Sequence, residues 1–150
     1  MTIPHRFGES TPFSVGVEEE LMIVDAESLL LVPRVVELMT EAEGVSLKTE
    51  LFASVVEATT GVHETAAEAV AEVESLRGRA AAAARRIGLR IMAAGSHPIS
   101  LPEQQSIVAE QRYLSFVEYA GVSARFVSSA RSHFTSRRRA TARASSSAWL

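Results

Sequence analysis

The stretch FSVGVEEELMIVD, residues 13–25, has the pattern of a β-strand although it carries three adjacent glutamates. Side chains alternate between the two faces of a strand, so Glu18 and Glu20 point to one face and Glu19 points to the other. Adjacent like charges repel each other in a strand, so such a cluster needs a compensating role. Two carboxylates on one open strand face predict a magnesium site.

The residues around the glutamates separate the two faces further. Ser14 and Gly16 share the face of Glu18 and Glu20 and leave open space beside them. The opposite face is apolar and forms a candidate core, made of Phe13, Val15, Val17, Leu21 and Ile23. We therefore expect Glu19 to pair with an arginine or to lie at the sheet margin. The alternative is a solvated edge strand protected by its charges, which the apolar residues on both sides of the triplet disfavour.

The rest of the pattern predicts several further elements. These are a short strand over 29–32, helices over 34–43 and 107–119, a β-rich segment within 45–60, a long helix from the Thr65 cap to Gly88, and a short buried strand over 89–94. The spacing of Thr65 and Glu68 is that of a capping box. Glycine just beyond an apolar helical stripe predicts the end of that helix. After Gly121 neither a helical nor a strand period persists, and residues 125–150 show no credible folded element.

Composition limits the classes of protein to which this chain can belong. Of its 150 residues, 47% are hydrophobic and 22% are charged, with a formal net charge of −3 and no cysteine. Thiolate metal sites and disulfides are therefore excluded. No apolar run approaches the roughly 18 to 20 residues that cross a bilayer, and the N-terminus has no signal-peptide core. We expect a cytoplasmic protein without a membrane partner.

Charge divides the chain into two unequal parts. All 18 acidic residues lie in 1–120, whereas 121–150 hold six arginines and no acid. We predict one catalytic-domain segment, 1–124, followed by a disordered Arg/Ser/Ala-rich tail, 125–150. Arg137–Arg139 could neutralise nucleic-acid phosphates. This interpretation ranks lowest, because the tail lacks lysine and interleaved aromatic residues, and we expect no nucleic-acid partner.

Three strings in order carry a resemblance to a known family. FSVGVEEELMIVD, ELFASVVEATTGV (50–62) and AAGSHPI (93–99), with the long helix between the last two, resemble the YbdK-like carboxylate–amine ligases of the glutamate–cysteine ligase type 2 family. The resemblance covers about 12–124. It implies the N-terminal part of a glutamine-synthetase-like fold, an α+β structure with helices packed on an antiparallel sheet that holds ATP and Mg²⁺.

The resemblance also implies an activity and a set of site residues. The activity is ATP-dependent ligation, in which a carboxylate is phosphorylated and an amine then displaces the phosphate, with glutamate and cysteine as the name-giving small-molecule substrates. The implied metal ligands are Glu18, Glu20 and Glu57, and Arg112 is implied to face a substrate carboxylate. No catalytic residue is identified.

Several of these residues keep a second interpretation. Taken alone, Glu57 is as compatible with an ordinary ion pair as with a ligand. Glu50 is a weaker candidate, because an unbroken strand would put it in a different alternation phase from Glu57. His97 stands at a strand end, where sites often form. The pattern is as compatible with a structural histidine as with a substrate contact. Arg112 can equally be a surface arginine.

The chain departs from the family pattern after residue 124. Family members are much longer and continue with a His- and Val-rich strand, whereas the surroundings of His133 do not reproduce that motif. We expect a truncated or frameshifted ligase whose authentic sequence ends near Arg125, a hypothesis that resequencing would test. Its incomplete sheet would leave open edges and little activity. The alternative is a non-catalytic half of a split assembly, or a binding module that pairs through such an edge, including as a homo-oligomer.

Overall fold

The computed structural model describes residues 11–126 and 132–136. Its elements follow in the order β1 (Val15–Asp25), α1 (Val35–Glu41), β2 (Leu47–Thr49), β3 (Val55–Thr59), α2 (Ala66–Arg86), β4 (Leu89–Met92), the 3₁₀ turn η1 (Pro102–Gln104), α3 (Gln111–Ala120), the 3₁₀ turn η2 (Gly121–Phe126) and β5 (Ser132–Ser136). Helices and an antiparallel sheet confirm the predicted α+β class. The relation to the glutamine-synthetase fold stays a prediction.

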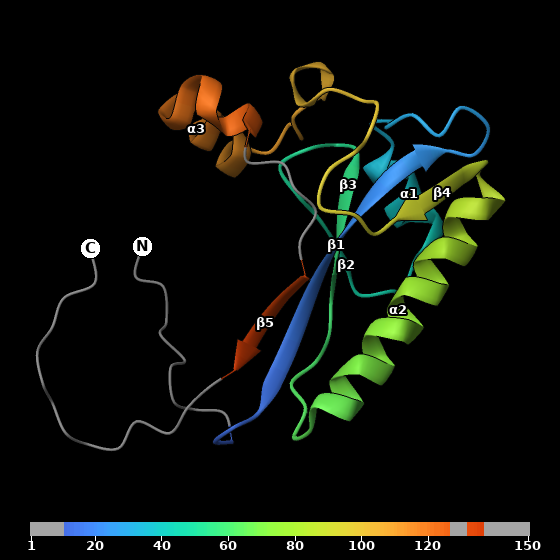
Figure 1. Cartoon of the computed structure of the whole chain (residues 1–150), viewed down its shortest axis with the longest axis vertical. Coiled ribbons are helices and arrows are strands. Elements are labelled where there is room, and N and C mark those ends of the chain that lie inside the picture. Colours follow the sequence, from blue (N-terminus) through green and yellow to red (C-terminus); the bar gives the residue numbers. More distant parts are fainter. Residues whose placement is uncertain (1–10, 127–131, 137–150) are drawn as a thin grey trace, which may run out of the picture.

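The long strand β1 organises the sheet. On one side it pairs with β3, and β3 pairs with β2. On its other side it pairs with β4 through its C-terminal part and with β5 through its N-terminal part. All four pairings are antiparallel, and Figure 1 shows β5 beside the first half of β1. The strand with the glutamates is therefore an inner strand among the described elements.

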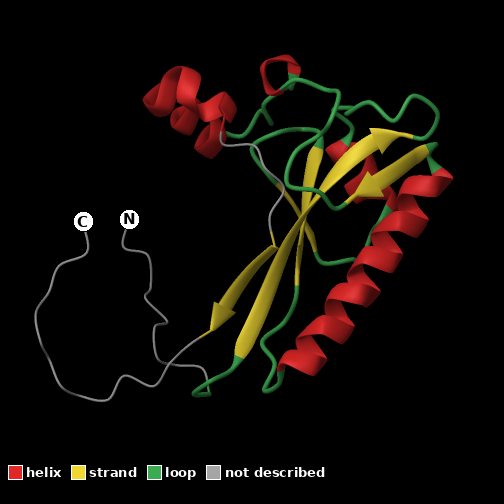
Figure 2. Ribbon diagram, in the orientation of Figure 1, coloured by secondary structure: helices red, strands yellow, loops and turns green. Residues whose placement is uncertain are grey.

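Helix α2 forms because its ends and its composition both favour a helix. The Thr65 Oγ1 accepts from the Glu68 N–H (3.2 Å) and the Glu68 carboxylate accepts from the Thr65 N–H (3.1 Å), which confirms the capping box. Gly88 takes φ = +71° just beyond the helix, a conformation that glycine adopts without steric cost. Figure 2 shows α2 running alongside the sheet.

The core lies between α2, α1 and the sheet. Small side chains on α2 let its backbone approach the strands closely, and Leu76 is its one large buried side chain. The sheet contributes Leu21, Ile23, Val56 and Leu89, each fully or almost fully buried. Leu21 and Ile23 therefore confirm the apolar face predicted for β1.

Several predicted local features are wrong. Phe13 is 69% exposed and takes φ = +67° in the turn before β1, so it is not part of the core. The segment 29–32 makes only an isolated bridge, between Val24 and Leu31. The helix predicted from Ile107 begins at Gln111, because Ile107 instead forms a bridge with Phe52. In each case a tertiary contact or a turn overrides the local periodicity.

The C-terminal part also differs from expectation. We predicted no folded element in 125–150, yet β5 occupies Ser132–Ser136 and pairs with Val15–Glu19. A five-residue strand of Ser, Thr, His and Phe carries too weak an alternation to be recognised without its partner strand. Residues 127–131 and 137–150 of the predicted disordered tail lie outside the described residues. Within the described part, no helix is both long and apolar enough to cross a membrane.

Candidate functional site

Strand alternation places Glu18 and Glu20 on one face of β1 and Glu19 on the other. Glu19 is 4% exposed, whereas Glu18 and Glu20 are half-buried. The Glu19 carboxylate accepts two hydrogen bonds from Arg77 on α2, at 3.0 Å from Nε and 2.6 Å from Nη2. The predicted arginine partner of Glu19 is therefore confirmed, and Glu19 belongs to the sheet–helix interface.

The register of β1 and β3 brings Glu57 beside the other two glutamates. Glu20 lies directly opposite Glu57, and Glu18 lies opposite Thr59. Residues opposite each other in an antiparallel pair point to the same face, with Cβ atoms about 5 Å apart. All three predicted metal ligands thus share one face of the sheet, with Glu20 and Glu57 as direct neighbours.

The same carboxylates do not form a complete metal centre by themselves. The Glu57 Oε1 lies 3.4 Å from the Lys48 Nζ and accepts from the Thr59 Oγ1 at 3.0 Å. Among residues 11–126 and 132–136, no group of three or more His, Asp or Glu side chains is arranged to hold a metal. A pair of carboxylates is nevertheless a donor set that Mg²⁺ accepts, since this ion usually keeps several waters.

A pocket of about 190 Å³ opens beside this pair. Its wall consists of Glu20 and Met22 from β1, Leu31, residues of the segment 50–55, and residues of the loop 96–105. Glu50 also lines the pocket, although the alternation argument set it aside. That argument assumed an unbroken strand, whereas β2 ends at Thr49 and β3 begins at Val55. A Gly- and Pro-free segment gives no sequence signal of such a break.

His97 lines this pocket but its ring is engaged by the protein. Its Nδ1 accepts from the backbone N–H groups of Ile99 (3.3 Å) and Ser100 (2.9 Å). The Nε2 therefore carries the proton and donates to the Leu29 carbonyl at 3.0 Å. This is the geometry of a structural histidine that shapes the loop 96–102, and the substrate contact stays a prediction.

Arg112 lies apart from the pocket wall. Its guanidinium donates to the Glu110 carboxylate (3.0 Å) and to the side chain of Thr49 (3.0 Å), and it stacks 4.3 Å from the centre of the Tyr113 ring. The Tyr113 hydroxyl donates to the Thr49 carbonyl at 2.6 Å. Burial raises the pKa of Tyr113 above its ordinary value. Arg112 thus joins α3 to β2, and its predicted role toward a substrate stays untested.

A β-bulge next to Glu18 escaped the sequence analysis. The Thr60 N–H donates to the Val17 carbonyl (2.9 Å), but the Val17 N–H donates to the Thr60 hydroxyl (2.9 Å) instead of a carbonyl. Val15 and His63 then exchange two backbone hydrogen bonds of 2.8 Å each. Between these two pairs, two residues of the segment that follows β3 thus lie opposite a single residue of β1. This arrangement defines a bulge. A threonine hydroxyl in place of a backbone acceptor is its distinguishing feature.

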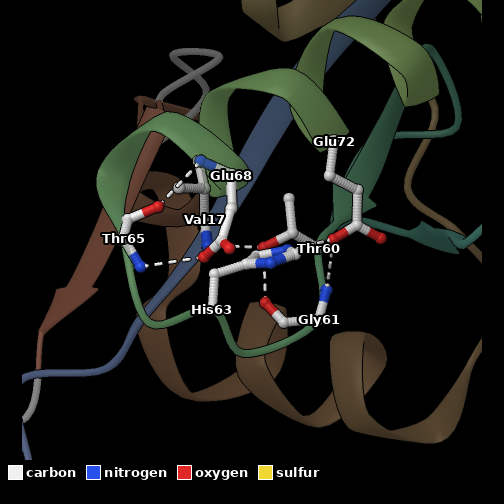
Figure 3. Close-up of polar contacts among 7 residues, drawn as sticks. All are labelled: Val17, Thr60, Gly61, His63, Thr65, Glu68 and Glu72. Carbon is white, nitrogen blue, oxygen red and sulfur yellow. Dashed lines mark hydrogen bonds and ion pairs between the residues drawn. The ribbon is translucent and has the colours of Figure 1, made fainter.

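Helix α2 fixes this bulge through Glu72. Its Oε2 accepts from the Gly61 N–H (2.9 Å) and lies 2.5 Å from the His63 Nε2, as Figure 3 shows. The hydrogen bond from His63, followed by that from Gly61, lowers the pKa of Glu72 below its ordinary value against the opposing effect of burial. Bulges are frequent beside active sites because they redirect side chains. Thr60 and Glu72 are therefore candidate positioning residues for the carboxylate face.

Comparison with known proteins gives a family match over most of the chain. The family model described as glutamate-cysteine ligase family 2 matches residues 14–135. The match includes β1, the pocket segments and most of β5, and it continues past Arg125, beyond the limit expected from the sequence strings.

Individual relatives carry names from the same family. The "Putative glutamate–cysteine ligase 2-3" of Rubrobacter xylanophilus is 36% identical over 124 residues, covering 80% of this chain and 34% of that protein. The "Putative glutamate–cysteine ligase 2" of Herpetosiphon aurantiacus is 38% identical, covering 76% of this chain and 30% of that protein. A protein of that same name from Sorangium cellulosum is 42% identical and is covered over 30% of its length. The chain spans about a third of the length of the curated relatives it matches.

Proposed function

Because this chain belongs to glutamate-cysteine ligase family 2, we propose that it is the N-terminal part of an ATP-dependent carboxylate–amine ligase. In the proposed reaction a substrate carboxylate attacks the γ-phosphorus of ATP and ADP leaves. The amine then attacks the carbonyl carbon of the acyl phosphate, an amide bond forms, and inorganic phosphate departs with the loss of one proton. The observation that carries this proposal is the Glu20–Glu57 pair on one face of the sheet.

We assign these carboxylates to magnesium binding. Glu20 and Glu57 would hold the ion, with Glu18 on the same face of the sheet. Bound magnesium would neutralise phosphate charge, which is the main requirement of phosphoryl transfer. Lys48 competes for Glu57, but 53% of the Lys48 side chain is exposed, so that ion pair contributes little. Replacing Lys48 with methionine removes a positive charge beside Glu57 and is expected to strengthen metal binding slightly.

Metal binding is testable without ligase activity. Mn²⁺, a paramagnetic ion with similar oxygen ligands, is titrated into the purified chain and followed by electron paramagnetic resonance. Glu20→Gln and Glu57→Gln are each expected to lose most of the bound ion. The exposed Glu43→Gln is the matched control and is expected to bind as the parent does. Equal binding by all four proteins would contradict the assignment.

The chain spans about a third of the length of these relatives, and we infer that ligation uses residues outside the matching segment. We therefore expect little or no ATP-dependent phosphate release from this chain alone. The direct test replaces the matching segment of the Rubrobacter protein with residues 14–135 of this chain. The chimera is expected to form an amide from glutamate and an amine with release of ADP and phosphate, and its Glu20→Gln form is expected to fail. A folded chimera that ligates no amine, beside an active parent, would refute the proposal.

A second candidate function is that of a non-catalytic half that pairs through an open sheet edge. It is favoured by the sheet order β2-β3-β1-β4, in which β4 pairs on one side only within the described residues. An unpaired strand edge is a template for association. Light scattering of the purified chain distinguishes the two outcomes. A single defined oligomer supports this function, and a monomer or a polydisperse aggregate contradicts it.

A further inference from the structure

We propose that the pocket beside Glu20 binds the amine substrate, and that this amine is bulkier and more apolar than cysteine. The inference rests on the proposed ligase function and specifies one substrate class for it. Glu20 belongs both to the carboxylate pair with Glu57 and to the pocket wall. A molecule in the pocket therefore lies beside the residues assigned to phosphoryl transfer.

The shape and lining of the pocket indicate an apolar occupant. Apart from the two glutamates, its wall is dominated by side chains such as Met22, Phe52, Ile99 and Leu101. One water molecule occupies roughly 10 to 15 Å³ of cavity volume, so a pocket of about 190 Å³ far exceeds what the mercaptomethyl side chain of cysteine fills. An apolar group that fills this space gains from leaving water.

The polar groups in the wall interact mainly with the protein itself. The Ser54 hydroxyl donates to the Gln105 side-chain oxygen at 2.8 Å, and the Gln105 amide donates to the Leu101 carbonyl at 3.2 Å. The Ser100 hydroxyl accepts from the Leu31 N–H at 3.1 Å. Together with the two engaged ring nitrogens of His97, these contacts hold the loop 96–105 against the sheet. The wall is thus preformed and offers few polar atoms to a ligand.

Charge distinguishes an amine from an acid at this pocket. Glu20 and Glu50 are the charged residues of its wall, and no lysine or arginine of the described part lines it. Glu50 is half-buried, and its Oε2 accepts from the Leu51 N–H at 2.8 Å. A substrate carboxylate would face the like charge of Glu50 in a wall that contains no lysine or arginine of the described part, whereas a protonated amine would be attracted. The acid substrate and the phosphates must therefore approach from outside this pocket.

The test compares three ligands of similar shape and different charge with one smaller amine. Isopentylamine, isopentyl alcohol, isocaproate and the small amine cysteamine are titrated into the full chain in the absence of ATP, and backbone amide shifts of the wall residues are followed by NMR. Isopentylamine is expected to bind at least about fivefold more tightly than isocaproate, the ratio for roughly 1 kcal/mol of charge preference. It is also expected to bind more tightly than cysteamine, because cysteamine buries less apolar surface.

Three variants make the result specific to this pocket. Glu50→Gln should weaken isopentylamine binding while leaving that of isopentyl alcohol unchanged. Leu101→Trp, at a side chain that is 55% exposed and tolerates enlargement, should weaken isopentylamine binding about tenfold by filling the pocket. Val36→Trp, at a 70% exposed position outside the pocket, is the matched control and should bind as the parent does.

The outcomes separate this inference from the proposed function. Equal binding of isocaproate, equal binding of cysteamine, or insensitivity to Leu101→Trp would overturn the inference even if the chimera ligates glutamate to cysteine. The expected binding pattern would support the inference as a statement about the pocket even if the chimera ligates nothing. That second failure would count against the ligase function alone.

Discussion

The ion pair between Glu19 and Arg77 offers the sharpest test of how the sheet and α2 are held together. The perturbation is Arg77→Met, which keeps an unbranched side chain with good helix propensity and removes the guanidinium. The Glu19 side chain is 5% exposed and the Arg77 side chain is 45% exposed. The substitution therefore leaves the buried Glu19 carboxylate without its arginine partner. In the parent protein, the hydrogen bonds with Glu19 raise the pKa of Arg77, as expected for a cation held by a carboxylate.

The expected loss of stability follows from these exposures. Removing one partner of a fully buried pair costs about 3 to 5 kcal/mol, whereas an exposed pair contributes about 1 kcal/mol or less. With one partner buried and the other half exposed, we expect Arg77→Met to lower the free energy of unfolding by about 2 kcal/mol. The double variant Glu19→Leu, Arg77→Met should recover most of this loss, because no buried charge remains without a partner.

The assay is urea unfolding followed by far-UV circular dichroism, with the free energy of unfolding extrapolated to water. Arg85→Met on the same helix is the control, since Arg85 is exposed and forms no ion pair within the described residues. It should change stability by no more than about 0.5 kcal/mol. If Arg77→Met is no more destabilising than Arg85→Met, or if the double variant is less stable than Arg77→Met, the reasoning is wrong.

Three further predictions concern the bulge and the end of α2. Thr60→Val removes the acceptor of the Val17 N–H and should cost about 1 to 3 kcal/mol in urea unfolding, whereas Thr60→Ser should cost less; equal losses would contradict this role of the hydroxyl. Gly88→Ala should cost about 1 kcal/mol because of the positive φ alone, since a Cβ there meets nothing within 4 Å; an unchanged unfolding midpoint would refute it. The pKa of Glu72 is lowered by His63 in the folded state, so its stabilisation is present above the ordinary pKa and is lost as pH falls through the folded value. The stability difference between the parent and Glu72→Gln should therefore shrink between about pH 5 and pH 3, and a difference that is constant over this range would contradict the assigned partner.

Local rules predicted the features that depend on neighbouring residues. The alternation of β1 separated Glu19 from Glu18 and Glu20, and the spacing of Thr65 and Glu68 located the start of α2. Gly88 marked the end of that helix. These predictions succeeded because strand alternation, capping and positive φ act over one to four residues.

The same rules failed where distant segments meet. Phe13 fits the core face by alternation, but a turn before β1 exposes it. Glu50 was ranked as a weaker candidate by an alternation argument that assumes an unbroken strand, and the break between β2 and β3 has no sequence mark. Strand β5 is recognisable only from its pairing with β1. In each case the deciding interaction joins residues that local patterns treat as independent.

The sequence by itself determined the faces of β1, the limits of α2 and the resemblance that the family match confirms. Only the tertiary structure decided that Arg77 is the partner of Glu19, that Glu20 lies opposite Glu57 on the neighbouring strand, and that Glu50 and Glu20 line the same pocket. The physical reason is strand register. Alternation fixes the face on which a side chain lies, but a shift of register changes every cross-strand neighbour, and register is set by the packing of the whole sheet against α2.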